Sequence, residues 1–247
     1  MLSGDWTVRV GNTVISTATT AAVIYGPTSR TIKLTATPPS EAVSVGILPL
    51  GWTHLIGLSA ARFADRLAPL SEVFPDTATS LRRALQDADS DDAKRSVLDD
   101  IFLSLGAQRA EPSSLLLRAH QLILDPAITT AEEFAAGLGR SGRQVSRLSR
   151  EMFGFSPKLL LRRQRFLRSL TVLRTNHGRP WSELIDPAYY DHSHFVRDFR
   201  RFMGMSPSQY YALPRLMVDH AARMREQQIG QSHQGFDLPA GARKTKT

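Results

Sequence analysis

The chain has 247 residues, of which 42% are apolar, and it contains no cysteine. A chain of this length can bury one large core or two smaller ones. The lack of cysteine excludes disulfide bonds, thiolate metal ligands and cysteine nucleophiles, and it fits a reducing cytoplasm. No apolar run reaches the ~18 residues that span a bilayer, and the first residues do not resemble a signal peptide. We therefore expect a cytoplasmic protein without a membrane partner.

The net charge of +8 is unevenly spread along the chain. Residues 1–126 hold 11 Lys and Arg against 13 Asp and Glu, whereas residues 127–247 hold 20 against 10. This asymmetry indicates a basic functional region joined to a nearly neutral one, although a solvated basic surface gives the same counts.

The N-terminal part has the pattern of short strands followed by helices. Four segments rich in β-branched residues are bounded by Gly, Pro, Asn or Ser, namely 7–16, 21–26, 30–36 and 42–48. The spacing of apolar residues then changes to a helical period. The segments that fit helices are 59–68, 78–88, 92–107 and 113–124. Asp125 before Pro126 marks a boundary, because the residue before proline disfavours helical backbone. We expect a β-rich and then helical domain over 1–126, with a regulatory or oligomerisation role.

From residue 127 onwards the pattern is helical. Thr130 followed three residues later by Glu133 has the capping-box pattern of a helix start. Pro180 stands at the expected first position of a later helix. The helical segments are TTAEEFAAGL (129–138), GRSGRQVSRLSREMFG (139–154), SPKLLLRRQRFLRSLTVLR (156–174), RPWSELID (179–186), SHFVRDFRRFMG (193–204) and SPSQYYALPRL (206–216). The polar residues 217–247 are expected to form a disordered tail.

The basic region contains an internal repeat with a spacing of fifty residues. When 134–157 is aligned with 184–207, five of 24 positions are identical, where chance gives roughly one or two. The identical pairs are Arg147 and Arg197, Arg150 and Arg200, Gly154 and Gly204, Ser156 and Ser206, and Pro157 and Pro207. Two copies are too few for a solenoid, so the repeat predicts a duplicated module.

Each copy contains a helix with one apolar face and one arginine face. At about 100° per residue, Val145 shares a face with Leu148 and Met152, and the Phe residues at 195, 199 and 202 form the matching stripe. Arginine and small polar side chains occupy the opposite faces, and these groups bind guanine edges and phosphates. A short helix and a tight turn precede each of them, which is the helix-turn-helix order. A solvated face requires no particular register, so the repeated arginine positions favour DNA reading.

Residues 127–216 resemble the DNA-binding domain of the AraC/XylS family of bacterial transcription regulators. The resemblance rests on S-x-R-x-V-S-R-L-x-R (141–150), GFSP (154–157), YYDHSHFVRDFRRFMGMSP (189–207) and Tyr210. It implies an α+β chain whose all-α C-terminal domain has two helix-turn-helix subdomains joined by a long helix. It also implies recognition helices in adjacent major grooves and control of transcription. Ser149 stands where the family usually has a buried Phe, and Pro187 shortens the helix before the second turn.

The expected DNA contacts lie on the two repeated helices and at the start of the connecting helix. They are Ser141, Arg143, Gln144, Ser146, Arg147, Arg150, Lys158, His192, Ser193, His194, Val196, Arg197, Arg200 and Arg201. The connecting helix has other arginines, which are expected to be exposed to solvent or to contact another helix. They are Arg162, Arg163, Arg165 and Arg168. His192 and His194 cannot share one metal ion, because two helix positions lie about 200° apart.

Double-stranded DNA is the expected partner, and no cofactor is expected. The resemblance leaves RNA polymerase, a small-molecule effector in the N-terminal half and a second copy of the chain as open candidates. Two other functions also stay open. The arginine faces could grip phosphates alone, giving a low-specificity nucleic-acid-binding protein, or residues 1–126 could bind a ligand or catalyse a reaction beside an accessory basic domain. No nucleophile and base stand at a recognisable spacing, which favours a protein that is not an enzyme.

Overall fold

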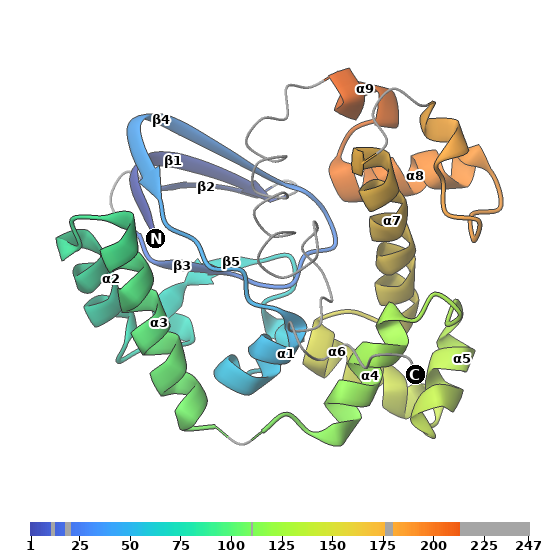
Figure 1. The fold of residues 1–247 in the computed structure, drawn as a ribbon, viewed down its shortest axis with the longest axis horizontal. Helices are drawn as coiled ribbons and strands as arrows, with labels where there is room; N and C mark the ends of the chain where they lie inside the picture. The colour runs from blue at the N-terminus through green and yellow to red at the C-terminus, as the bar shows by residue number, and fades with distance from the viewer. Residues whose placement is uncertain (11–12, 18–20, 110, 176–179, 213–247) are drawn as a thin grey trace. The chain divides into compact units, whose positions relative to one another are not determined.

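The computed structural model of the chain describes residues 1–10, 13–17, 21–109, 111–175 and 180–212. These residues form two compact units. The first unit contains Met1–Leu116 with Leu148–Phe155, and the second contains Leu117–Arg147 with the chain from Ser156 onwards. Figure 1 traces the elements in chain order and shows strands in the N-terminal part and helices in the C-terminal part, which is the expected α+β class. The expected tail at 217–247 lies outside the described residues.

Two small antiparallel sheets form in the first unit. β1 (Leu2–Val10) lies between β2 (Thr13–Thr17) and β4 (Ile32–Ala42), while β3 (Val23–Tyr25) pairs with β5 (Leu67–Pro69) (Figure 1). The centre of the larger sheet is Val8, which is opposite Ile15 on β2 and Leu34 on β4. Val8 packs with Leu2 and Val10 in a buried cluster, because alternate side chains of a strand share one face.

Short helical turns and two longer helices complete the first unit. The turns are α1 (Pro49–Gly51), η1 (Trp52–Ile56), η2 (Ala60–Arg62) and η3 (Leu70–Glu72). Trp52, Phe63 and Phe74 form a second buried cluster under them. The longer helices α2 (Ala78–Asp87) and α3 (Asp91–Ala107) lie within one residue of the predicted spans 78–88 and 92–107.

Three predicted elements of this unit differ from the structure. The segment 7–16 was expected to be one strand, but it is divided between β1 and β2. Residues 43–48 are not part of a strand, although Val43 still exchanges backbone hydrogen bonds with Met1 at 2.6 and 2.9 Å. Residues 59–68 were expected to be a helix but hold η2 and the start of β5. Asp65 interrupts a helix there with φ 53°, and its carboxylate accepts hydrogen bonds from the backbone and hydroxyl of Ser29, both at 2.6 Å.

The second unit begins with a helix pair. From Leu117 onwards, α4 (Ser114–Leu124) packs on α5 (Ala131–Leu138), and Arg118 Nε donates to the carbonyl of Gly137 over 3.4 Å. A Cβ on Gly137 would lie only 2.9 Å from the methyl groups of Leu122, so the two helices approach closely because this residue has no side chain. The boundary expected at residue 126 therefore separates two helices that pack together.

The start of α5 has the predicted capping box. The Thr130 hydroxyl accepts from the Glu133 backbone at 3.1 Å, and the Glu133 carboxylate accepts from the Thr130 backbone at 3.1 Å. Backbone N–H groups of Thr129 and Thr130 that donate to this carboxylate lower the pKa of Glu133.

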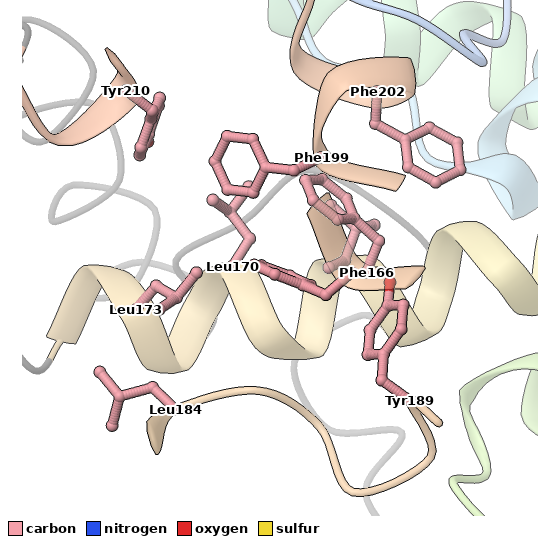
Figure 2. Close-up of a cluster of buried hydrophobic side chains, with 10 residues drawn as sticks. Phe166, Leu170, Leu173, Leu184, Tyr189, Phe199, Phe202 and Tyr210 are labelled. Carbon is pink, nitrogen blue, oxygen red and sulfur yellow. The ribbon is translucent and has the colours of Figure 1, made fainter. Parts of the chain in front are cut away.

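The remaining helices are α6 (Gly142–Phe153), α7 (Pro157–Thr175), the short η4 (Trp181–Glu183), α8 (His192–Met203) and α9 (Pro207–Ala212). In α7, Phe166, Leu170 and Leu173 belong to one buried cluster with the aromatic stripe of α8 and with Tyr210. Figure 2 shows these side chains gathered around α7. No helix within the described ranges is long and apolar enough to cross a membrane.

Candidate nucleic-acid interface

The two copies of the repeat have the same backbone pattern. α6 and α8 each contain 12 residues, and their bounds differ by fifty positions. Gly154 (φ 85°) and Gly204 (φ 70°) follow them, and their N–H groups donate to the carbonyls of Arg150 and Arg200 at 3.0 and 2.9 Å. Only glycine adopts such positive φ without steric cost. Pro157 and Pro207 then start the next helices. The repeated Gly-x-Ser-Pro is thus a helix stop followed by a helix start.

Polar side chains cap the first turn of both helices. Gln144 Oε1 accepts from the backbone and the hydroxyl of Ser141, both at 3.0 Å, so these two residues form a capping box for α6. At α8, Asp191 accepts from the His194 backbone at 2.6 Å. Ser141 and Gln144, which were predicted to contact DNA, are exposed and cap α6 in the structure. The Ser-x-x-Gln spacing in the sequence already carried that signal.

One face of each helix is buried. On α6 the buried residues are Val145, Ser149 and Phe153, and on α8 they include the predicted stripe of Phe195, Phe199 and Phe202. Ser149 occupies the repeat position of Phe199, and its side chain faces the core as predicted. Its hydroxyl finds no hydrogen-bond partner among the residues that the structure describes. The buried faces orient the arginine faces outward.

Most of the expected DNA contacts are exposed. The exposed residues are Ser141, Arg143, Gln144, Arg147, Arg150, Lys158, His192, Ser193, Arg197, Arg200 and Arg201. The half-buried residues are Ser146, His194 and Val196.

Four of the outward arginines have no ion pair in the described part of the chain. Within the described ranges, none of the ion pairs includes Arg143, Arg147, Arg197 or Arg200. Two of these, Arg147 and Arg197, are equivalent in the repeat. Exposed cations attract polyanions, and guanidinium groups hydrogen-bond phosphates and guanine edges.

The arginines of α7 are engaged within the fold instead. Arg162 Nε donates over 2.5 Å to Asp198, a fully buried carboxylate on α8, and Arg165 lies 3.8 Å from the same group. Arg168 pairs with Asp186 at 2.7 Å. Arg162 and Arg165 are therefore interhelical, one of the two alternatives expected from the sequence, and Arg168 pairs with the segment that precedes α8. Asp198 was missed, although its helical position between Phe195 and Phe202 places it on the core face, where a carboxylate needs a cationic partner.

The two histidines of α8 lie against different aromatic rings. The His192 ring is 5.8 Å from Trp181, and the His194 ring meets the edge of Tyr189 at 5.1 Å. His194 Nε2 is also 3.4 Å from Arg165 of α7. The imidazole of His194 therefore takes part in the α7–α8 interface, and His192 is the more exposed of the pair.

The helix before the second turn is reduced to the single turn η4. Pro180 caps it instead of being its first residue, and the segment before α8 includes Pro187. This agrees with the expected shortening by Pro187. Tyr189 closes the segment by donating from its hydroxyl to Asp198 at 3.0 Å.

Comparison with known families locates the domain. Residues 134–212, which begin in α5 and end with α9, match a family described as a helix-turn-helix domain, which is of the AraC type. Neither the curated proteins nor the solved structures give a match to the chain. The match supports an AraC-type helix-turn-helix domain at residues 134–212, of the kind found in DNA-binding transcription regulators.

Proposed function

We propose that the chain is a sequence-specific transcription regulator whose helices α6 and α8 read adjacent major grooves of DNA as two helix-turn-helix subdomains. The observation that carries this proposal is the equivalence of Arg147 and Arg197. Both are exposed, both lack an ion pair within the described part of the chain, and both stand at the same position of helices with equal length and the same glycine stop.

The position of each arginine along its helix indicates whether it contacts a base or a phosphate. Arg147 and Arg197 lie about one turn from the N-terminal end, which enters the groove in helix-turn-helix docking, so they are placed to reach guanine. Arg200 lies nearly a turn later, where a helix leaves the groove and passes the backbone. Lys158 on α7 is a second phosphate ligand. The other outward residues, Arg143, Ser146, Arg150, His192, Ser193, Val196 and Arg201, surround these positions.

The length of α7 fits a two-groove arrangement. Its 19 residues extend about 28 Å at ~1.5 Å per residue, and successive major grooves on one face of DNA are ~34 Å apart. A single chain with two unequal readers should bind a non-palindromic site of roughly 20 bp. RNA polymerase and a second copy of the chain are the expected protein partners of such a regulator.

The test begins with selection of bound sequences from random DNA, followed by titration of variants on the preferred and a scrambled duplex. Arg197→Ala should lose roughly 1–3 kcal/mol on the preferred duplex, relax the preference at one or two base pairs, and change scrambled DNA less. Arg147→Ala should have the same effect in a milder form. Ser149 stands at the repeat position of Phe199, so α6 is less firmly packed than α8 and holds its arginine less rigidly. Arg200→Ala should weaken both duplexes similarly and lower the salt slope by about one.

A matched control is Arg83→Ala on α2, since Arg83 is exposed and pairs with Asp87 on the same helix. Its affinity for both duplexes should equal that of the wild type. Equal losses on both duplexes for Arg197→Ala would contradict base reading and support the low-specificity, phosphate-gripping protein instead. Recovery of a strict palindrome with one reader in each half-site would contradict the two-groove arrangement.

A further inference from the structure

The fifty-residue repeat also pairs the two residues that come directly before the caps of α6 and α8. It places Arg140 on Tyr190, and the cap residue Ser141 on the cap residue Asp191. Both Arg140 and Tyr190 are exposed, and Tyr190 leaves 94% of its surface open to solvent. A large side chain that donates hydrogen bonds therefore stands outside the start of each helix.

The backbone at both positions is held by its neighbours. Gly139 ends α5 with φ 61°, and the N–H of Arg140 then donates to a carbonyl of α5 over 3.2 Å. Tyr190 stands between Tyr189, which is buried, and Asp191, which caps α8. None of the ion pairs in the described part of the chain includes Arg140. The two side chains thus start from fixed points and extend into solvent.

Their position favours contact with the DNA backbone. In helix-turn-helix docking, the N-terminal residues of the second helix contact base edges in the groove. The residue before the cap belongs to the turn, outside the helix, and phosphates form the edge of the groove. Arginine and tyrosine side chains commonly donate to phosphate oxygens. Tyrosine also loses little conformational freedom on binding, because it has only two rotatable side-chain bonds.

We propose that Arg140 and Tyr190 each hold one DNA phosphate at the edge of the groove that the following helix occupies. Arg140 donates from its guanidinium and Tyr190 donates from its phenol hydroxyl, both to non-bridging phosphate oxygens. This inference rests on the proposed function, because it requires α6 and α8 to lie in two successive grooves. The two phosphates are then about one helical turn of DNA, ~10 bp, apart.

The two contacts differ in strength. Arg140 is a cation and precedes a neutral cap formed by Ser141 and Gln144. Tyr190 is a neutral donor and precedes the carboxylate of Asp191, which repels a phosphate. Hydrogen bonds from a charged donor are also the stronger ones. Arg140 should therefore contribute more to affinity and to its salt dependence than Tyr190 does.

The first test is titration of conservative variants on the preferred and a scrambled duplex at several salt concentrations. Arg140→Gln should weaken binding to both duplexes roughly 10-fold and lower the salt slope by about one. Tyr190→Phe removes only the hydroxyl and should weaken both roughly 3- to 10-fold with the salt slope unchanged. Arg83→Gln on α2, which is exposed and distant in sequence from the repeat, is the control and should bind as the wild type does.

The second test locates the phosphates. Single neutral methylphosphonates are placed in turn along the preferred duplex, and each duplex is titrated with the wild type and both variants. At one position the substitution should weaken the wild type but leave Arg140→Gln unaffected, because that variant has already lost the contact. A second position, about 10 bp away, should behave in the same way for Tyr190→Phe.

Three results would overturn the inference. The first is wild-type affinity of both variants, and if Arg197→Ala still loses affinity on the preferred duplex, the proposed function stands without it. The second is full affinity of Tyr190→Phe beside a weakened Tyr190→Ala, since the ring rather than the hydroxyl would then contact DNA. The third is a methylphosphonate scan with no position that distinguishes the variants from the wild type.

Failure of the proposed function has a different signature. If selection from random DNA recovers no preferred sequence, base reading by α6 and α8 is contradicted. A phosphate contact does not depend on sequence, so losses of Arg140→Gln and Tyr190→Phe on the scrambled duplex would still support the two phosphate contacts.

Discussion

The hydroxyl of Tyr189 donates a hydrogen bond of 3.0 Å to Asp198, a carboxylate of α8 with no exposed surface. Burial of the phenol, followed by the charge of Asp198, raises the pKa of Tyr189, so the phenol remains a proton donor at neutral pH. Arg162 of α7 supplies the compensating positive charge. The proposed reading helix is therefore held on α7 by a buried charge network as well as by its phenylalanine stripe.

The first prediction concerns that network. Arg162→Ala should lower the free energy of unfolding by roughly 3 kcal/mol, because it deprives a fully buried carboxylate of its closest cation. Arg168→Ala should cost about 1 kcal/mol or less, since its partner Asp186 is partly exposed. Urea unfolding followed by circular dichroism measures both. Equal losses for the two variants would show that the buried network contributes no more than the Arg168–Asp186 pair.

The second prediction compares two buried serines. The Ser149 hydroxyl has no hydrogen-bond partner within the described ranges, whereas the Ser169 hydroxyl accepts from the Asp186 backbone at 2.9 Å. Ser149→Ala should raise the free energy of unfolding by about 1 kcal/mol, because it removes a desolvated hydroxyl. Ser169→Ala should lower it by about 1 kcal/mol, because the partly buried N–H of Asp186 loses its acceptor. Thermal and urea unfolding give both values, and a loss of stability in Ser149→Ala would contradict the prediction.

The third prediction concerns where the DNA-binding fragment begins. The sequence alone suggests that residues 127–216 fold independently. Because α4 packs on α5 through Leu122 and Gly137, we propose instead that an independent fragment needs α4 and starts near Ser113, whose hydroxyl caps that helix at 3.2 Å. Fragment 112–216 should show a cooperative thermal transition and keep most of the DNA affinity, and fragment 127–216 should not. Equal stability of the two fragments would place the boundary back at residue 126.

The fourth prediction uses the α5 cap. The pKa of Glu133 is lowered in the fold below its ordinary value of 4.5. The stability that its ionised form contributes is therefore complete above pH 4.5 and is lost as the pH falls through the folded pKa. The stability difference between wild type and Glu133→Gln should be constant at neutral and mildly acidic pH and shrink below that value. Glu132→Gln, an exposed neighbour outside the cap, is the control. A difference that does not change in acid would exclude the cap as its source.

The sequence by itself determined the local features of this protein. The fifty-residue repeat could be seen in the sequence, and the places of α6 and α8, the glycine stops and the capping box of Thr130 and Glu133 follow from residues within one or two helical turns. The arginine faces could be predicted for the same reason, since helical periodicity alone separates them from the apolar stripe. The DNA-binding assignment depends on these features.

The tertiary structure decided what depends on residues far apart in the chain. β4 ends at Ala42, opposite Leu2 of β1, and residues 43–48, which were expected to be a strand, lie outside it. The expected boundary at 126 divides α4 from α5, which only the close approach at Gly137 reveals. Asp198 acquires its role from arginines 33 and 36 positions away on α7. The pairing of strands, helices and buried charges is set by which distant surfaces can pack together, and no local pattern contains that information.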